Sequence, residues 1–270
     1  GVLDRVGATL KRPTKEHFVF GAPEFSADQL IARAFGAPGL VRREFLARLG
    51  TISTYSIAPD VARPPQRFSG EERLAKDGSN LYHSWARFEH NKEQARRVVS
   101  LFSQVVPGVG GIRFRSMGQY GTIEIDFDCG KNRVLTIDGS GLSDGALRAL
   151  GILVAVFHPL PSALTCIEEP EVSVHPYAAG RLLDAILSGQ QGRQLVLTTQ
   201  SPTLLDESAI RPEMLRIVEW REGRTLAGPI DARQMEQIRE RLVKESELLT
   251  EGAIEMQAPT RSPSSLKPRG

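Results

Sequence analysis

The stretch from Ala163 to Pro176, ALTCIEEPEVSVHP, joins a short apolar run to three carboxylates, Glu168, Glu169 and Glu171. A short apolar run bounded by turn residues predicts a strand that is buried on both faces, as in a parallel sheet. Glu168 and Glu169 would then leave the carboxyl end of the strand, where open α/β sheets bind ligands. Because neighbouring side chains of an extended segment point in opposite directions, one carboxylate can face a metal ion while the other faces an attacking water.

Taken alone, these carboxylates also fit a solvated acidic turn after a core strand, so the neighbouring segments decide between the two interpretations. Gly192 to Asp206, GRQLVLTTQSPTLLD, repeats the design, with an apolar strand, a polar tip that includes Gln200, and a Ser201-Pro202 helix start. Upstream, Gly141 to Arg148, GLSDGALR, opens an apolar helix. The order helix, strand, helix, strand predicts an α/β fold with polar residues at the carboxyl end of each strand.

These segments resemble the motifs of the ATP-binding-cassette (ABC) ATPases, specifically the SMC- and RecF-like predicted ATPases of the AAA family. LSDG at Leu142 to Gly145 resembles the signature motif, and CIEEPE at Cys166 to Glu171 resembles the Walker B segment. VSVHP at Val172 to Pro176 resembles the D-loop, and TTQSP at Thr198 to Pro202 stands where the family usually carries a switch histidine. The looser resemblance runs from about Gly78 to about Glu255. It implies a P-loop NTPase fold of the ABC-ATPase type, a mainly parallel sheet flanked by helices with an antiparallel β-hairpin block.

The sequence departs from the family pattern in two ways. The 270 residues contain no G-x-x-x-x-G-K followed by Ser or Thr, the loop whose amides cradle phosphates. The one Gly-Lys pair, Gly130-Lys131, is followed by Asn132 and is typical of a hairpin turn. Because the chain starts at Gly1, we expect the family's first strand, phosphate loop and first helix to be absent and the cassette to be truncated at its N-terminus. Gln200 is the second departure, since an amide cannot become cationic as a histidine can.

The resemblance implies a role for each candidate residue. Glu168 takes the Walker B position and holds Mg²⁺ through water. Glu169 is the candidate general base, or water-orienting residue, for attack on the γ-phosphate, and Gln200 contacts that phosphate. In cassette ATPases the signature motif contacts ATP that the opposite subunit holds. The residues expected to make this contact are Ser143, Asp144 and Gly145 at a helix start, together with His175 at the dimer seam. Ser143 is equally typical of a plain helix N-cap.

The function that the resemblance implies is ATP binding and hydrolysis through an ATP-dependent, head-to-tail homodimer. It places this activity in DNA repair, chromosome maintenance or defence against foreign DNA, with DNA or a nuclease as further partners. ATPase activity is expected only when the missing Walker A segment is supplied. The alternative hypothesis is a non-catalytic cassette remnant that serves as a protein-interaction module. The missing loop and Gln200 favour this alternative, whereas the intact Glu168-Glu169 pair opposes it.

Composition sets wider bounds on the class of protein. With 40% apolar and 24% charged residues the sequence is typical of a soluble globular protein, and its net charge of +2 favours no class of partner. Cys129 and Cys166 fall on predicted strands and indicate reduced core thiols in a cytoplasmic protein. The longest apolar run, Ala149 to Phe157, is far shorter than the roughly 20 residues of a membrane helix. One basic cluster could mark a nucleic-acid face, but without aromatic neighbours it favours a solvated strand face: Arg113, Arg115, Lys131 and Arg133.

Periodicity predicts the remaining elements and three divisions of the chain. Expected helices are Ala27–Leu49, Asn80–Val106 with a bend near His90-Asn91, and Asp231–Leu249. Expected strands are His17–Phe20, Ile52–Ile57, Ile112–Ser116, Thr122–Asp128, Arg133–Ile137 and Leu215–Trp220, with loops at Pro59–Asp77 and Gly108–Gly111. We expect residues 1–139 to form the helical and β-hairpin part of the cassette. Residues 140–257 would form the ATPase core, and residues 258–270 a disordered tail.

Two weaker signals favour other chemistry. Gly141 to Gly145 matches the G-x-S-x-G nucleophile elbow, but Asp138 to Ser140 separate it from the preceding strand, which argues against a hydrolase. His83 and His90 could touch a metal from one helix face. Because no third ligand accompanies them, exposed or capping histidines are the favoured interpretation.

Overall fold

The computed structural model describes residues 17–20, 50–68, 70–160, 162–189, 194–221, 223–240 and 242–257. The described strands form two sheets. Sheet A has the order β10-β9-β1-β8-β7-β2, and sheet B has the order β3-β5-β4 with β6 also paired to β5. The strands of sheet A are β1 His17–Phe20, β2 Ile52–Tyr55, β7 Leu164–Glu168, β8 Gln194–Thr199, β9 Ile217–Arg221 and β10 Arg224–Gly228. The expected helix Ala27–Leu49 and the tail 258–270 lie outside the described residues.

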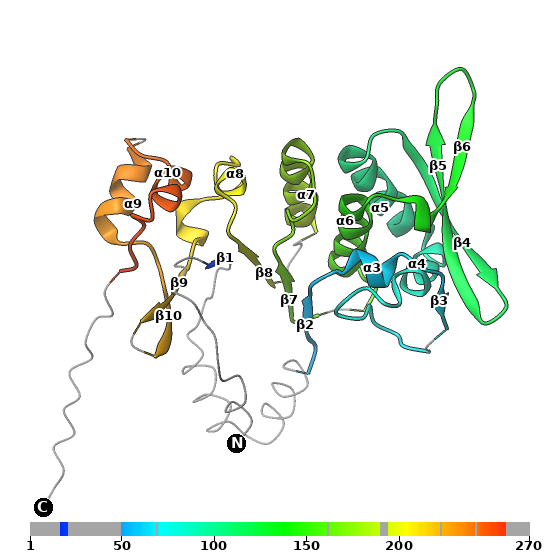
Figure 1. Ribbon diagram of the computed structural model, residues 1–270, viewed down its shortest axis with the longest axis horizontal. Coiled ribbons are helices and arrows are strands. Elements are labelled where there is room, and N and C mark those ends of the chain that lie inside the picture. The colour runs from blue at the N-terminus through cyan, green and yellow to red at the C-terminus, as the bar shows by residue number, and fades with distance from the viewer. Residues whose placement is uncertain are drawn as a thin grey trace, which may run out of the picture.

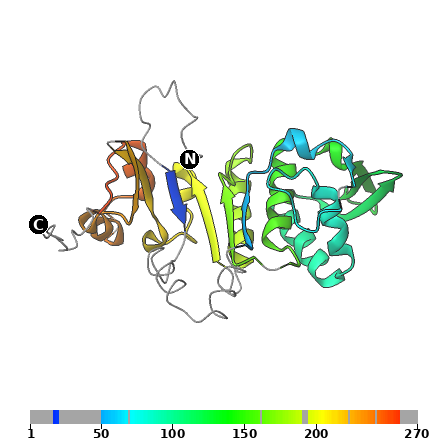
Figure 2. The same cartoon turned by 90° about the horizontal axis from the view of Figure 1, so that it is seen from below.

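Sheet A is parallel at its centre and antiparallel toward one edge. Strands β2, β7 and β8 run parallel, with Ile167 opposite both Tyr55 and Leu197. The segment His17–Phe20 forms the expected strand, β1, which lies antiparallel between β8 and β9. Strands β1, β8, β7 and β2 lie side by side in Figure 2. Since β1 and β2 both join this sheet, segments from the first fifth of the chain complete the sheet formed by its second half.

Two long helices cover one face of the parallel strands. Helix α6, Asp144–Val156, and helix α7, Pro176–Ser188, stand on the same side of β7 and β8 (Figure 1). On β7 and β8 every second residue is buried, while the residues between them are half-buried or exposed. The prediction that the Glu-tipped strand is buried on both faces is therefore wrong for the described part of the chain. The alternation arises because α6 and α7 pack on the same face.

Sheet B and its helices form a block beside the β2 edge of sheet A (Figure 1). Its strands are β3 Gln66–Arg67, β4 Val109–Met117, β5 Tyr120–Asp128 and β6 Val134–Asp138, and its helices are α4 Leu81–Glu89 and α5 Lys92–Val105. The predicted helix bend is confirmed as a break at His90-Asn91, where the Asn91 side chain caps α5. The three predicted strands are confirmed as antiparallel hairpins. The predicted Gly108–Gly111 loop is wrong, because β4 starts at Val109 and continues through a bulge.

Two of the four residues of the basic cluster, Arg113 and Arg115, form ion pairs on sheet B. Arg113 of β4 pairs with Glu124 and Asp126 of β5, and Arg115 pairs with Glu124 and with Asp138 of β6. Cross-strand ion pairs of this kind stabilise a solvated sheet face. The arrangement favours the solvated strand face over a nucleic-acid face.

The segment that precedes α4 is held by two buried amides instead of being a plain loop. It contains the short helix α3, Pro59–Ala62, and strand β3, so the predicted loop Pro59–Asp77 is wrong. The Gln66 amide donates to the carbonyl oxygens of Ala62 and Gly78 and accepts from the Tyr82 backbone N–H. Asn80 is bonded similarly to Glu71, Arg73 and Ala75. A buried amide costs little only when its bonds are satisfied, and these two fix the path of the segment.

The C-terminal part of the described chain differs from its prediction in two respects. Strand β9 is followed by β10, and the predicted helix Asp231–Leu249 is divided into α9, Ala232–Arg239, and α10, Glu245–Thr250. The division lets Leu248 and Leu249 be buried while α10 packs on the short helix α8, Pro202–Leu205.

The two cysteines differ in exposure. Cys166 on β7 is half-buried, whereas Cys129 is exposed in the β5–β6 turn, so the expectation of two core thiols is wrong for Cys129. In the described residues no helix combines the length and apolar character needed to cross a bilayer.

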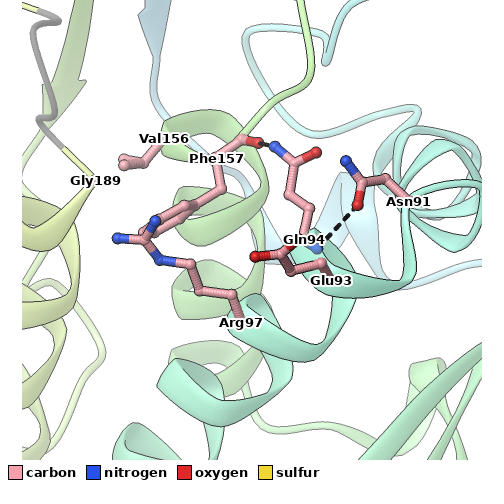
Figure 3. A pocket seen from close by; sticks show the side chains of 7 residues that line it. All are labelled: Asn91, Glu93, Gln94, Arg97, Val156, Phe157 and Gly189. Carbon is pink, nitrogen blue, oxygen red and sulfur yellow. Dashed lines mark hydrogen bonds between the residues drawn. The ribbon is translucent and has the colours of Figure 1, made fainter.

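Helix α5 is attached to the C-terminal ends of α6 and α7 across a pocket of about 330 Å³ (Figure 3). Arg97 lies 4.9 Å from the centre of the Phe157 ring and donates to the Ser188 carbonyl oxygen at 2.9 Å. Gln94 donates to the Phe157 carbonyl oxygen. A guanidinium at a helix C-terminus satisfies orphan carbonyls and opposes the helix dipole. The pocket is thus a packing joint at the end of α6 and α7 away from the glutamates.

His83 is a buried polar residue of the sheet B block. It is buried between the rings of Phe68 and Phe114, with centroid distances of 5.1 and 5.4 Å, and both of its ring nitrogens lack a hydrogen-bond partner. Burial holds the pKa of His83 below its ordinary value of 6.5. The expectation of exposed or capping histidines is therefore wrong for His83 and right for His90, which caps α4.

The fold should lose stability in mild acid because of His83. Since its pKa is lowered by folding, the unfolded chain binds more protons, and the free energy of unfolding should fall as pH drops below 6.5. Urea titrations above and below that pH would measure the change. His83→Phe should reduce this dependence on pH, whereas the same change at exposed His90 should leave it intact. An equal dependence in both variants would contradict the assignment to His83.

Candidate functional site

The candidate residues gather at the carboxyl ends of β7 and β8. Parallel pairing places Glu168 opposite Thr198, so the tips of the two strands share one edge of sheet A. Glu169 follows β7 and Gln200 follows β8. The structure therefore brings together the Walker B-like and switch-like segments.

Glu168 faces a lysine that the sequence analysis did not single out. Its Oε1 lies 3.7 Å from Nζ of Lys76, and both side chains are largely solvent-accessible. The backbone of Lys76 is fixed, because its carbonyl oxygen accepts from the Ser56 N–H at 2.9 Å beyond β2. A partly exposed carboxylate at this edge can serve as an oxygen ligand for a hard cation such as Mg²⁺.

Glu169 has a left-handed backbone and a defined partner. Its φ of +43° is rare for a residue other than glycine, and its N–H donates to the Thr198 carbonyl oxygen at 3.0 Å. Its Oε1 accepts a hydrogen bond from Nε2 of Gln200 at 2.8 Å. Glu168 and Glu169 thus have separate partners, as predicted. The predicted cause is wrong, because a turn at Glu169 directs the two side chains apart and not the alternation of an extended strand. Conformations of this kind cluster at functional sites.

Glu171 contacts the end of β8, although its position in the sequence did not predict a role for it. Its Oε1 accepts from the Thr199 hydroxyl, while its Oε2 is buried without a partner. Burial raises the pKa of Glu171, although the Thr199 hydroxyl opposes this shift. Its place as the third acid of the cluster was the sole sequence signal, because burial of the side chain depends on contact with β8.

The signature-like segment is held by Arg63. Its guanidinium pairs with Asp144 and donates to the carbonyl oxygens of Ser140 and Leu142 at 3.0 and 2.5 Å. Ser143 is the N-cap of α6, since its side chain accepts from the Ala146 N–H at 3.3 Å. The N-cap interpretation of Ser143 is confirmed. Arg63 was missed because the segment that carries it was predicted to be a loop.

Gly145 allows the start of α6 to touch the D-loop-like turn. A Cβ atom at Gly145 would lie 2.3 Å from the carbonyl oxygen of Ser173 and 3.3 Å from the Cα of Val174. Ser173 itself has a positive φ of +64°. No side chain fits between two backbones this close, so glycine is required by the approach.

His175 is exposed at the start of α7. Its Nδ1 accepts from the Tyr177 N–H at 3.3 Å, which makes it the N-cap of the helix. Ser143 and His175 thus bond to the backbone of their own helices, while Glu169 bonds to the end of β8. In one chain the site has two parts, the glutamate edge and the pair of helix starts, with the 170–175 turn between them.

Comparison with known proteins gives the family. The model described as "AAA domain, putative AbiEii toxin, Type IV TA system" matches residues 24–206. The chain belongs to this family. The match covers the signature-like, Walker B-like and D-loop-like segments and ends just after the switch-like segment, so the resemblance to ABC-type, SMC-like AAA ATPases is confirmed. No curated protein matched the sequence.

Solved structures of SMC head domains are similar at low identity. The chain matches the Smc head domain with a coiled coil and joint from Pyrococcus yayanosii at 17% identity and a TM-score of 0.39, covering 57% of this chain and 30% of that one. It matches the SmcHead bound to the C-winged helix domain of ScpA at 15% identity and a TM-score of 0.45, covering 72% and 62%. A structure titled for ATP-driven dimerisation and DNA-stimulated activation of SMC ATPases matches at 17% and 0.41, covering 60% and 98%. The chain thus spans under two thirds of two of these three proteins.

Gly145→Ala should destabilise the protein because the new methyl group would collide with the Ser173 carbonyl oxygen. Overpacking of this kind costs about 1–3 kcal/mol, which urea denaturation would measure as a lower free energy of unfolding. Gly141→Ala is the matched control, since a Cβ there meets nothing closer than Ile137 at 4.0 Å. Equal stability of the two variants would show that the 170–175 turn moves aside without cost.

Proposed function

We propose that this chain binds and hydrolyses ATP as an ABC-type ATPase that acts through an ATP-dependent homodimer. The observation that carries the proposal is the hydrogen bond from Gln200 to Glu169, beside Glu168, at the carboxyl edge of the parallel strands. Family membership supports the ATPase class. DNA repair, chromosome maintenance and defence against foreign DNA are the processes in which we propose that it acts, with DNA or a nuclease as a further partner.

The residues fit a magnesium ion that is bound mainly by the nucleotide. The described residues contain no group of three His, Cys, Asp or Glu side chains placed to hold a metal. Mg²⁺ commonly keeps several waters and uses one or two carboxylates together with substrate phosphates, so Glu168 alone suffices on the protein side. When bound, the ion would supply positive charge to the phosphates. Lys76 lies opposite the charge of Glu168 in the structure, and Glu168 would exchange this lysine for the ion.

Glu169 and Gln200 supply the chemistry that acts on water. We propose that Glu169 accepts the proton of the attacking water or orients that water, which is the contribution expected of a general base. The amide of Gln200 donates to Glu169 and so fixes the direction in which its carboxylate points. A neutral amide cannot add positive charge at the γ-phosphate, so its part is orientation.

The two helix starts are proposed to contact ATP held by the second copy of the chain, through Ser143, Asp144, Gly145 and His175. Ser143 and Asp144 are exposed at the N-terminus of α6, where backbone amides and the helix dipole favour an anion. Arg63 pairs with Asp144 at the same place and so offsets the negative charge that this carboxylate would present to an anion. His175 is exposed at the neighbouring helix start.

The rival hypothesis is a non-catalytic interaction module, and the next two experiments separate it from the ATPase.

Residues 1–270 should bind Mg-ATP weakly, because their sequence has no amide cradle with a lysine for the β- and γ-phosphates. Isothermal calorimetry would measure the affinity. The same residues joined to a phosphate-binding loop should bind in the micromolar range or tighter. Micromolar binding by residues 1–270 themselves would show that the phosphates have another site. Weak binding by both proteins would favour the interaction module.

In a protein that joins these residues to a phosphate-binding loop, Glu169→Gln should slow hydrolysis at least about 10²-fold, the usual scale for loss of a positioned base. ATP affinity should stay nearly unchanged, and size-exclusion chromatography should show more ATP-bound dimer. Steady-state rates would be compared with Glu240→Gln, a control at an exposed residue that ends α9. Unchanged turnover in Glu169→Gln would remove this residue from the reaction.

A further inference from the structure

Glu171 lies next to the proposed catalytic pair without belonging to it. One of its carboxylate oxygens accepts from the Thr199 hydroxyl, and the other is buried with no partner. Burying a carboxylate is costly, and the hydrogen bond from Thr199 offsets part of that cost. Thr199 itself is fully buried at the end of β8.

The Thr199 hydroxyl makes two hydrogen bonds that constrain the backbone on either side of Gln200. It donates to Glu171, and it accepts a hydrogen bond from the Ser201 N–H at 3.0 Å. The residues before and after Gln200 are therefore fixed by the same oxygen atom. The Gln200 side chain can then reach Glu169 at 2.8 Å from a backbone that has little freedom.

We propose that Glu171 is a positioning residue that keeps the Gln200 amide on Glu169. It acts through the Thr199 hydroxyl, whose orientation it sets by accepting the hydrogen bond that this hydroxyl donates. The inference rests on the proposed function only for the catalytic meaning of Glu169, since the contacts themselves need no nucleotide. Glu171 touches neither water nor phosphate in this role.

The chemistry of the contact predicts which substitutions preserve it. Glu171→Gln keeps a carbonyl oxygen that can accept from Thr199, so it should keep Gln200 in place. Glu171→Ala removes the acceptor, and Thr199→Val removes the hydroxyl while keeping its shape. Both should free the Gln200 backbone and with it the bond to Glu169.

The test is a ¹⁵N nuclear magnetic resonance measurement on the full chain labelled at glutamine. The side-chain amide signal of Gln200 is assigned by its loss in Gln200→Ala, and Glu169→Ala gives the position of the unbonded amide. In Glu171→Ala and Thr199→Val the signal should move to that unbonded position. In Glu171→Gln and in the control Glu240→Ala it should stay where the unaltered protein has it.

The outcomes decide the proposal. A Gln200 signal that stays in place in folded Thr199→Val or folded Glu171→Ala overturns it, as does a signal that moves in folded Glu171→Gln. If Glu171→Ala fails to fold, Thr199→Val decides the result, because it removes the same bond at nearly constant volume. A merely structural role would lower the melting temperature without moving this one signal. Because the readout needs no ATP, failure to hydrolyse ATP would defeat the proposed function and leave this result standing.

Discussion

The parallel pairing of β7 with β8 is the constraint on which the rest of the site depends. It aligns Glu168 with Thr198 and therefore places the residues that follow both strands at one edge. The left-handed turn at Glu169 then directs the two glutamates to different partners, Lys76 and Gln200. A register shift by one residue would exchange the two faces of the strand and separate these groups.

The helix starts beside this edge are ordered by a close backbone approach together with one long side chain. Gly145 touches the carbonyl oxygen of Ser173, and Arg63 gathers the carbonyl oxygens that precede α6. The resulting surface presents the N-termini of α6 and α7 in a fixed relation to each other. A site divided in this way suits a nucleotide shared between two copies of the chain, as the proposed function requires.

Much of this could be predicted from the sequence, because periodicity and polar strand ends are local signals. They indicated β7, β8 and the helix start at Ser143, and resemblance to the family suggested the role proposed for Glu169. The positive φ at Glu169, the burial of Glu171 and the reach of Arg63 could not be predicted. Each depends on a partner distant in the sequence, and no local pattern records which distant side chain will arrive. The predicted single helix after Asp231 failed for the same reason, since packing against α8 divides it.

The Arg63–Asp144 contact spans 81 residues of sequence, and this separation bears on how the chain folds. Closing a long loop costs entropy before any contact compensates for it, so non-local contacts form late. The hairpins β4–β5 and β5–β6 join neighbouring segments and need no such closure. These hairpins should therefore form early, whereas the contacts of Arg63 with the signature-like segment should form late in folding.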